Sequence, residues 1–104
     1  MKKIIDGRVY NTSTADFICD VSGRGGSVSR DDFYYERTGL FRTKKGTWFI
    51  SGEGEGASRW RRFQFGGFSR GEGLETVTDE QAKQLIEEYS DAGVFEKYFE
   101  TEEG

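Results

Sequence analysis

The side chains that most often carry out chemistry in proteins are scarce in this sequence. The chain has no histidine and a single cysteine, Cys19. Without histidine it lacks the commonest general base, the commonest metal ligand and every Ser-His or Cys-His nucleophile pair. One cysteine also cannot build a zinc site from paired thiolates. We therefore expect a protein that is not an enzyme and has no cofactor or metal ion, with Cys19 buried in the core.

Carboxylates are the remaining groups that could act as acid–base pairs or bind a metal ion. Two pairs are close in sequence, Asp31 with Asp32 and Glu53 with Glu55. Neither pair matches a known ligand spacing such as that of the EF-hand loop, so we interpret both as solvated loop residues. A hydrolase or modifying enzyme built on carboxylates is the third-ranked interpretation of the sequence.

The glycine-rich segment 22–30 could expose backbone N–H groups, which can hold an anion. It lacks the Lys-Ser/Thr ending of a phosphate-binding P-loop, and no strand–helix pair is expected around it. Its composition predicts a plain flexible loop.

The charges are distributed unevenly along the chain. Residues 72–104 carry eleven acidic side chains and two lysines, whereas residues 1–71 carry thirteen basic and eight acidic side chains. A surface dense in carboxylates can occupy a groove built for nucleic-acid phosphates. The alternative is that this helical end is acidic only for solubility. The candidate partner-binding residues are Glu87, Glu88, Asp91, Glu96 and Glu100.

A second candidate surface comes from segment 59–70, in which arginine alternates with aromatic residues. Arginine can neutralise phosphates while aromatic rings stack on bases, as in proteins that bind single strands. The alternative is an amphipathic strand with Trp60 and either Phe63 or Phe65 in the core and its arginines in water. Because the net charge of the chain is −4, a basic protein is the more natural partner. The candidate nucleic-acid-binding residues are Arg59, Trp60, Arg61, Arg62 and Arg70.

The size and composition indicate one α+β domain spanning residues 1–104. The chain is short enough for one core, and its sixteen aromatic residues compensate for a hydrophobic content of 34%. No apolar run approaches the roughly 20 residues that span a bilayer. The apolar stretch after Lys3 is too short for a signal peptide. With one cysteine, the expected location is the cytoplasm.

The residue pattern of the first two-thirds of the chain predicts mainly antiparallel strands. Asp6-Gly7 predicts a tight hairpin between residues 3–5 and 8–10. Capping residues in segment 11–14 predict a short helix over 15–21, with Cys19 on its apolar face. The remaining predicted strands are 33–37, 40–43, 47–50, 59–65 and 74–77, with a turn at 44–46 and a loop at 52–56.

The clearest helix signal comes last. Thr78 and Gln81 fit a capping box, and an apolar stripe follows at helical spacing, with a second short helical face over 94–99. Hairpins adjacent in sequence imply an antiparallel sheet. The predicted fold is thus an antiparallel sheet, comprising the N-terminal hairpin and the central strands, packed against a short N-terminal helix and C-terminal helices.

Three segments resemble, in the same order, a group of short phage- and plasmid-borne proteins. They are KKIIDGRVYNTSTA at 2–15, LFRTKKGTWFISGEG at 40–54 and TDEQA at 78–82, together roughly a third of the chain. The group is similar to the mobile-element accessory proteins that include anti-CRISPR inhibitors. This resemblance implies a small, often acidic, non-enzymatic protein that binds and blocks a host defence complex.

Together, the resemblance and the acidic end predict an inhibitor that binds a bacterial Cas protein or effector complex in the host cytoplasm and blocks its nucleic-acid binding. The alternative is a small nucleic-acid-binding accessory module that uses segment 59–70. No membrane contact is expected. Exposed sheet edges leave both a monomer and a homodimer open.

Overall fold

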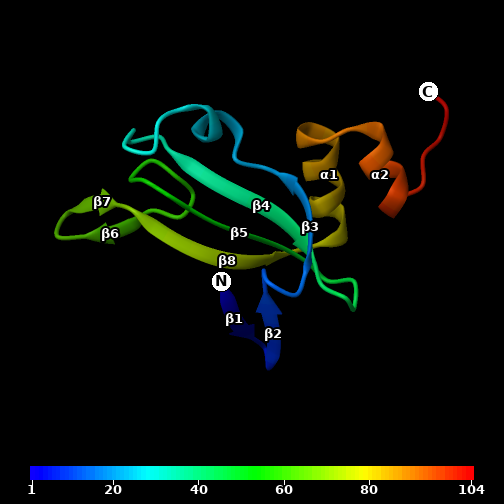
Figure 1. Ribbon diagram of the computed structural model, residues 1–104, viewed down its shortest axis with the longest axis horizontal. Helices are drawn as coiled ribbons and strands as arrows, with labels where there is room; N and C mark the ends of the chain where they lie inside the picture. Colours follow the sequence, from blue (N-terminus) through cyan, green and yellow to red (C-terminus); the bar gives the residue numbers. More distant parts are fainter.

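The computed structural model describes all 104 residues and shows an α+β fold, as the sequence predicts (Figure 1). A central antiparallel sheet has the order β3-β4-β5-β8, and the β1–β2 and β6–β7 hairpins form separate two-stranded sheets. None of the helices is long and apolar enough to cross a membrane. The elements are β1 (Lys2–Ile5), β2 (Arg8–Asn11), β3 (Asp16–Asp20), a short 3₁₀ helix (Gly23–Ser27), β4 (Glu36–Arg42), β5 (Trp48–Gly54), β6 (Arg62–Gln64), β7 (Gly67–Ser69), β8 (Gly71–Val77), α1 (Asp79–Tyr89) and α2 (Ala92–Tyr98).

The N-terminal hairpin forms where the sequence predicts it. Its two turn residues, Asp6 and Gly7, both have positive φ, at 51° and 75°. This is the geometry of a type I′ turn, whose twist matches that of the flanking strands. The turn sets the register in which Ile4 lies opposite Val9.

The predicted helix over 15–21 is wrong, because this segment forms strand β3 and pairs with β4. The polar residues before it make a turn and not a helix cap: the Asn11 side chain accepts from the Ser13 N–H at 2.8 Å. Phe17 lies opposite Phe41 on β4, and a β-bulge separates it from Cys19. Cys19 is buried as predicted, although from a strand. The two α-helices of this fold are both C-terminal.

Strand β5 continues to Gly54, through the first residues of the predicted 52–56 loop. Two pairs of glycines lie opposite each other across β5 and β8: Gly52 with Gly73, and Gly54 with Gly71. A Cβ atom on Gly54 would collide with Ser58, and one on Gly73 with the Trp60 ring. These glycines let the segment before β6 cross close over the sheet.

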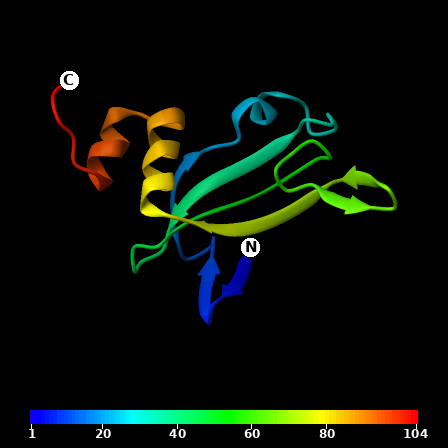
Figure 2. The ribbon, with the colours of Figure 1, turned by 180° about the vertical axis from the view of Figure 1, so that it is seen from behind.

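The helices and the N-terminal hairpin cover opposite faces of the central sheet (Figures 1 and 2). On one face, Ala82 and Ile86 of α1 pack against a cluster that includes Leu40, Trp48 and Trp60. On the other face, Tyr10 of the hairpin packs against Phe49 and Leu74. The alternation of Trp48, Phe49 and Ile50 along β5 supplies both cores, since successive strand residues point to opposite faces.

The C-terminal helices begin at well-formed caps. Thr78 Oγ1 accepts from the Gln81 N–H at 3.1 Å, and Gln81 Oε1 accepts from the Thr78 N–H at 2.9 Å, so the predicted capping box is confirmed. Asp91 caps α2 by accepting from the Val94 N–H at 2.9 Å. Aromatic residues at the end of α2 dock on the sheet, with the Phe99 ring stacked 5.7 Å from that of Trp48.

The predicted strand over 59–65 is partly wrong. Trp60 precedes the strand and is buried over the sheet, and β6 starts at Arg62. A turn at Phe65-Gly66 then leads into β7, which the sequence did not predict. The resulting β6–β7 hairpin projects at one end of the molecule, and α2 lies at the other end (Figure 1).

Candidate partner-binding surfaces

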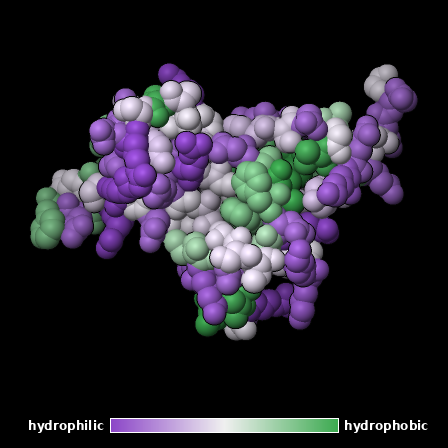
Figure 3. All heavy atoms as spheres, in the orientation of Figure 1, coloured by the Kyte–Doolittle hydropathy of each residue, from purple (hydrophilic) through white to green (hydrophobic).

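The five predicted acidic residues lie together on the helical end of the molecule. Glu87 and Glu88 are on α1, Asp91 caps α2, Glu96 is on α2, and Glu100 follows it. All five are exposed, and none forms an ion pair, since every ion pair of the structure joins residues within 1–71. In Figure 3 this end shows hydrophilic side chains around a hydrophobic area. The end therefore presents carboxylates that form no ion pair within the fold.

A hollow of about 300 Å³ opens between α1 and α2 among these carboxylates. Ile86 and Phe95 contribute apolar surface to it, and Glu87, Asp91 and Glu96 also line it. A lysine or arginine has a long apolar stem and a charged head, so such a side chain could place its stem against Phe95 and its charge among the carboxylates. The sequence identified the carboxylates but not the hollow, because the hollow depends on how two helices cross.

The five residues of the predicted nucleic-acid-binding set do not form one surface. Arg59 is bound by other residues of the fold, although its side chain is 34% exposed: its Nε lies 2.7 Å from Glu36 Oε2, and its Nη2 donates to the Val21 carbonyl at 2.9 Å. Trp60 is 7% exposed and donates from Nε1 to Thr38 Oγ1 at 2.9 Å. Both residues therefore hold the segment to the sheet and are not available to a partner.

Arg70 is also occupied. Its guanidinium binds Glu53 Oε2 and Glu55 Oε1, both at 2.8 Å. This contact lowers the pKa of Glu53 and raises the pKa of Arg70. The Glu53 and Glu55 carboxylates therefore hold Arg70 between them, an arrangement named here the Arg70 clamp. Of the predicted set, Arg61 and Arg62 are exposed and make no ion pair.

The structure adds three phenylalanines that the predicted set omits. On the β6–β7 hairpin, Phe63 is 70% exposed, Phe65 98% and Phe68 53%. Phe63 and Phe68 are cross-strand partners whose rings meet edge to face at 5.4 Å. The Arg61 guanidinium lies 5.1 Å from the Phe68 ring centre. Recognition of a Phe-Gly turn would have revealed this group from the sequence, but Phe-Gly is not a usual hairpin signal.

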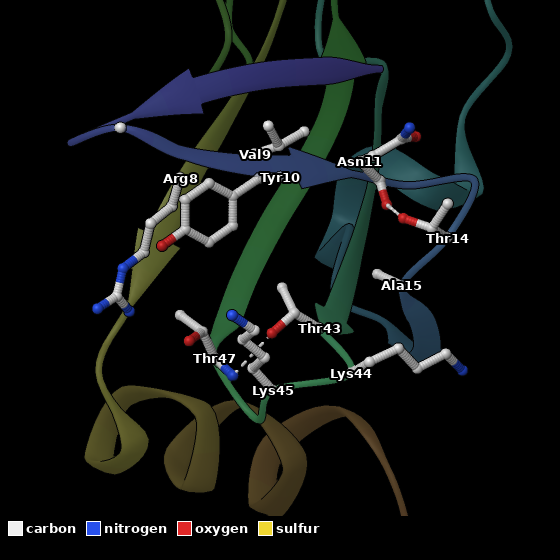
Figure 4. A pocket seen from close by; sticks show the side chains of 11 residues that line it. Arg8, Val9, Tyr10, Asn11, Thr14, Ala15, Thr43, Lys44, Lys45 and Thr47 are labelled. Atoms are coloured by element: carbon white, nitrogen blue, oxygen red, sulfur yellow. Dashed lines mark hydrogen bonds between the residues drawn. The ribbon is translucent and has the colours of Figure 1, made fainter.

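A separate hollow of about 500 Å³ lies between β2 and the turn joining β4 to β5 (Figure 4). Tyr10 and Arg8 reach it from β2, and Lys45 reaches it from the turn. Lys44 also lines it and binds Asp16 Oδ1 at 2.7 Å, which lowers the pKa of Asp16. Arg8 and Lys45 are exposed and form no ion pair, so the field here favours anions. No pattern in the sequence singles out these residues.

The remaining chemical candidates have structural roles. Asp32 accepts from the Tyr34 N–H at 2.8 Å and so closes a turn. The predicted glycine-rich loop contains the 3₁₀ helix, and Gly25 within it is buried against Glu36. Cys19 packs in the core, and its burial raises the pKa of the thiol, with a smaller contribution from Asp20.

The chain matches no protein-family model, no curated protein and no solved structure. The resemblance to anti-CRISPR accessory proteins therefore stays a prediction, and function has to be argued from the surfaces described above.

Proposed function

We propose that this protein inhibits a bacterial defence system by binding a Cas effector protein or complex in the cytoplasm of its host. The acidic surface of α1 and α2 would occupy a basic groove and block nucleic-acid binding there. The resemblance of the sequence to phage and plasmid accessory proteins supports the class of target. The charge distribution of the structure supports the mode of binding.

The observation that carries the proposal is the contrast between residues 1–71 and residues 72–104. Of the eight carboxylates in the first range, four, those of Asp16, Glu36, Glu53 and Glu55, each bind an arginine or lysine within 4 Å. None of the eleven carboxylates after residue 71 does so. Carboxylates without internal partners keep their full attraction for an external cation, and a cluster of them steers association over several ångströms. The unpaired end is thus the surface that favours a basic protein.

The exposed carboxylates act in place of the phosphates of a nucleic acid. Glu87 and Glu96 stand beside the hollow between the helices, where the stem of a partner's lysine or arginine can contact Phe95. Contacts of this kind add apolar burial to charge pairing, which matters because an exposed ion pair alone contributes only about 0–1 kcal/mol. A groove filled in this way cannot also hold a DNA or RNA backbone.

The test is inhibition of purified, guide-loaded Cas effectors, measured as the binding of fluorescent target DNA at 50 and 300 mM salt. We expect inhibition by the natural protein that weakens at the higher salt concentration. The Glu87→Lys/Glu96→Lys variant should raise the concentration needed for half-inhibition by about tenfold or more at 50 mM salt. Asp91 is left unchanged because it caps α2.

The matched control is the Asp31→Lys/Glu72→Lys variant, which changes the net charge equally. Asp31 and Glu72 are exposed and make no ion pair, and they lie outside the helices. Equal weakening by both variants would show that only net charge matters. Unchanged inhibition in the helix variant would reject the acidic surface as the binding site, and absence of inhibition across the effectors tested would reject the function.

A further inference from the structure

The β6–β7 hairpin exposes more apolar surface than its role in the fold explains. Its strands have three residues each and form a sheet of their own, separate from the central sheet. Large apolar side chains on such a small element cannot be buried by the hairpin itself. In Figure 3 the outer end of this hairpin is hydrophobic and stands clear of the rest of the molecule.

The turn of this hairpin contains a residue type that does not suit its backbone conformation. Phe65 and Gly66 have φ of 52° and 79°, almost the same as the 51° and 75° of Asp6 and Gly7 in the first hairpin. Aspartate, asparagine and glycine are the usual residues at the first position of such a turn, and the left-handed region costs other residues roughly 1–2 kcal/mol. The chain thus uses aspartate in one turn and phenylalanine in an equivalent one.

No contact within the fold compensates for this cost. The Phe65 side chain is 98% exposed, and a Cβ placed on the neighbouring Gly66 or Gly67 would meet nothing within 4 Å. Phe65 therefore neither fits its backbone conformation well nor packs against the protein. Such a residue is explained by a partner that covers its ring.

The charges near the hairpin indicate the sign of the charge on that partner. The sequence has no acidic residue between Glu55 and Glu72. The two other arginines of this region, Arg59 and Arg70, bind carboxylates of the fold, which leaves Arg61 and Arg62 unneutralised beside the exposed rings. The partner is therefore anionic and also offers apolar faces.

The position of Arg61 distinguishes between anionic partners. Its guanidinium lies 5.1 Å from the centre of the Phe68 ring, so the charge and the ring occupy the same level of the hairpin. Inserting Phe68 into a lipid bilayer or an apolar protein pocket would also desolvate the arginine, which is costly. A single-stranded nucleic acid instead alternates flat bases with phosphates, and both groups can be satisfied together.

We propose that the β6–β7 hairpin binds single-stranded nucleic acid, with bases stacked on Phe63, Phe65 and Phe68 and phosphates near Arg61 and Arg62. This site shares only Arg61 and Arg62 with the set predicted from the sequence, and it is independent of the inhibitor function proposed above. Two neutralised phosphates predict a slope of about −1.4 in a plot of log affinity against log salt, or a loss of about sevenfold from 50 to 200 mM.

The test is fluorescence anisotropy with labelled 15-residue oligo-dT and oligo-U, using the full chain. We expect saturable binding that Phe65→Asn weakens by about fivefold or more, the effect of losing one stacked base. Asparagine tolerates the turn geometry, so circular dichroism should show that the variant remains folded. The Arg61→Gln/Arg62→Gln variant should both weaken binding and flatten the salt dependence.

Matched controls come from the rest of the chain. Ile4→Thr removes an exposed apolar side chain from the other hairpin, and Lys2→Gln/Arg37→Gln removes two exposed cations elsewhere. Both should leave binding unchanged. Absence of binding at 50 mM salt, or equal binding by the Phe65→Asn variant, would overturn the proposal. Phe65-dependent binding to phosphatidylserine–phosphatidylcholine vesicles without binding to oligonucleotides would overturn it in favour of a lipid surface.

Discussion

At the residue scale, one buried hydroxyl joins the central sheet to the segment that crosses it. Thr38 Oγ1 donates to Glu36 Oε2 at 2.8 Å and accepts from Trp60 Nε1 at 2.9 Å. Glu36 also accepts from the Arg59 N–H at 3.0 Å. Thr38 thus lies at the centre of a polar network inside a low-dielectric region, where an unsatisfied group is costly.

Replacing this hydroxyl tests the network directly. Thr38→Val keeps the side-chain shape but leaves the Trp60 N–H without its acceptor and removes one donor from Glu36. We expect the free energy of unfolding to fall by about 1–3 kcal/mol, measured by urea denaturation. Thr76→Val, at an exposed position of β8, should change it by no more than about 0.5 kcal/mol. Similar values for the two variants would contradict a role for the network.

The Arg70 clamp predicts a dependence of stability on pH. The guanidinium lowers the pKa of Glu53, so its contribution is present above the ordinary glutamate pKa. That contribution is lost as the pH falls through the lowered value. The Arg70→Gln variant should therefore be less stable than the natural protein at pH 6.5, and the difference should shrink at pH 3.

Urea midpoints at the two pH values measure this effect. Lys2→Gln is the control, because Lys2 is exposed on β1 and forms no ion pair. The difference in urea midpoint between this variant and the natural protein should not change with pH. A stability difference for Arg70→Gln that persists unchanged at pH 3 would assign Arg70 a packing role in place of an electrostatic one.

At the element scale, paired glycines allow the chain to cross the sheet. A Cβ on Gly73 of β8 would lie 2.7 Å from Cε3 and 2.8 Å from Cζ3 of Trp60. This is too close for real atoms, and the buried ring has little room to move. We expect Gly73→Ala to lower the free energy of unfolding by about 1–3 kcal/mol, as overpacking does.

Gly67 on β7 offers the matched control for this change. It too is a strand glycine, but a Cβ there would meet nothing within 4 Å. Gly67→Ala should therefore leave the urea midpoint nearly unchanged. A comparable loss in both variants would show that backbone effects, and not the Trp60 contact, determine the result.

The elements that the sequence predicts correctly are those specified by neighbouring residues. Asp6-Gly7 contains all the information for its turn, and Thr78 and Gln81 form a complete capping box. The helix prediction for segment 15–21 fails because the capping residues before it, in segment 11–14, also suit a turn. Its strand state comes from pairing with residues 39–42, which no local pattern reveals.

The same distinction applies to the candidate sites. The exposure of Glu87, Glu88 and Glu96 could be predicted, because an amphipathic helix places its polar face in solvent whatever surrounds it. Arg59 and Arg70 could not be assigned, since their carboxylate partners Glu36 and Glu53 are 23 and 17 residues away. Phe65 was not singled out because its significance depends on a backbone angle.

At the scale of the whole molecule, the two proposed surfaces are far apart. The chain measures 49 × 35 × 20 Å along its principal axes, and the α2 helix and the β6–β7 hairpin lie at opposite ends of the longest one (Figure 1). A partner engaged by one end leaves the other accessible. Variants at either end should therefore act independently, as substitutions at distant sites usually do.

This separation places unpaired charges of opposite sign at the two ends of the molecule. Carboxylates gather at the helical end, and Arg61 and Arg62, which form no ion pair, lie at the hairpin end. In the field of a positively charged groove the protein would turn its helices inward before any contact forms. The β6–β7 hairpin, with its exposed phenylalanines, would then point away from the groove. Binding of the helices to the groove would thus also fix the orientation of the hairpin.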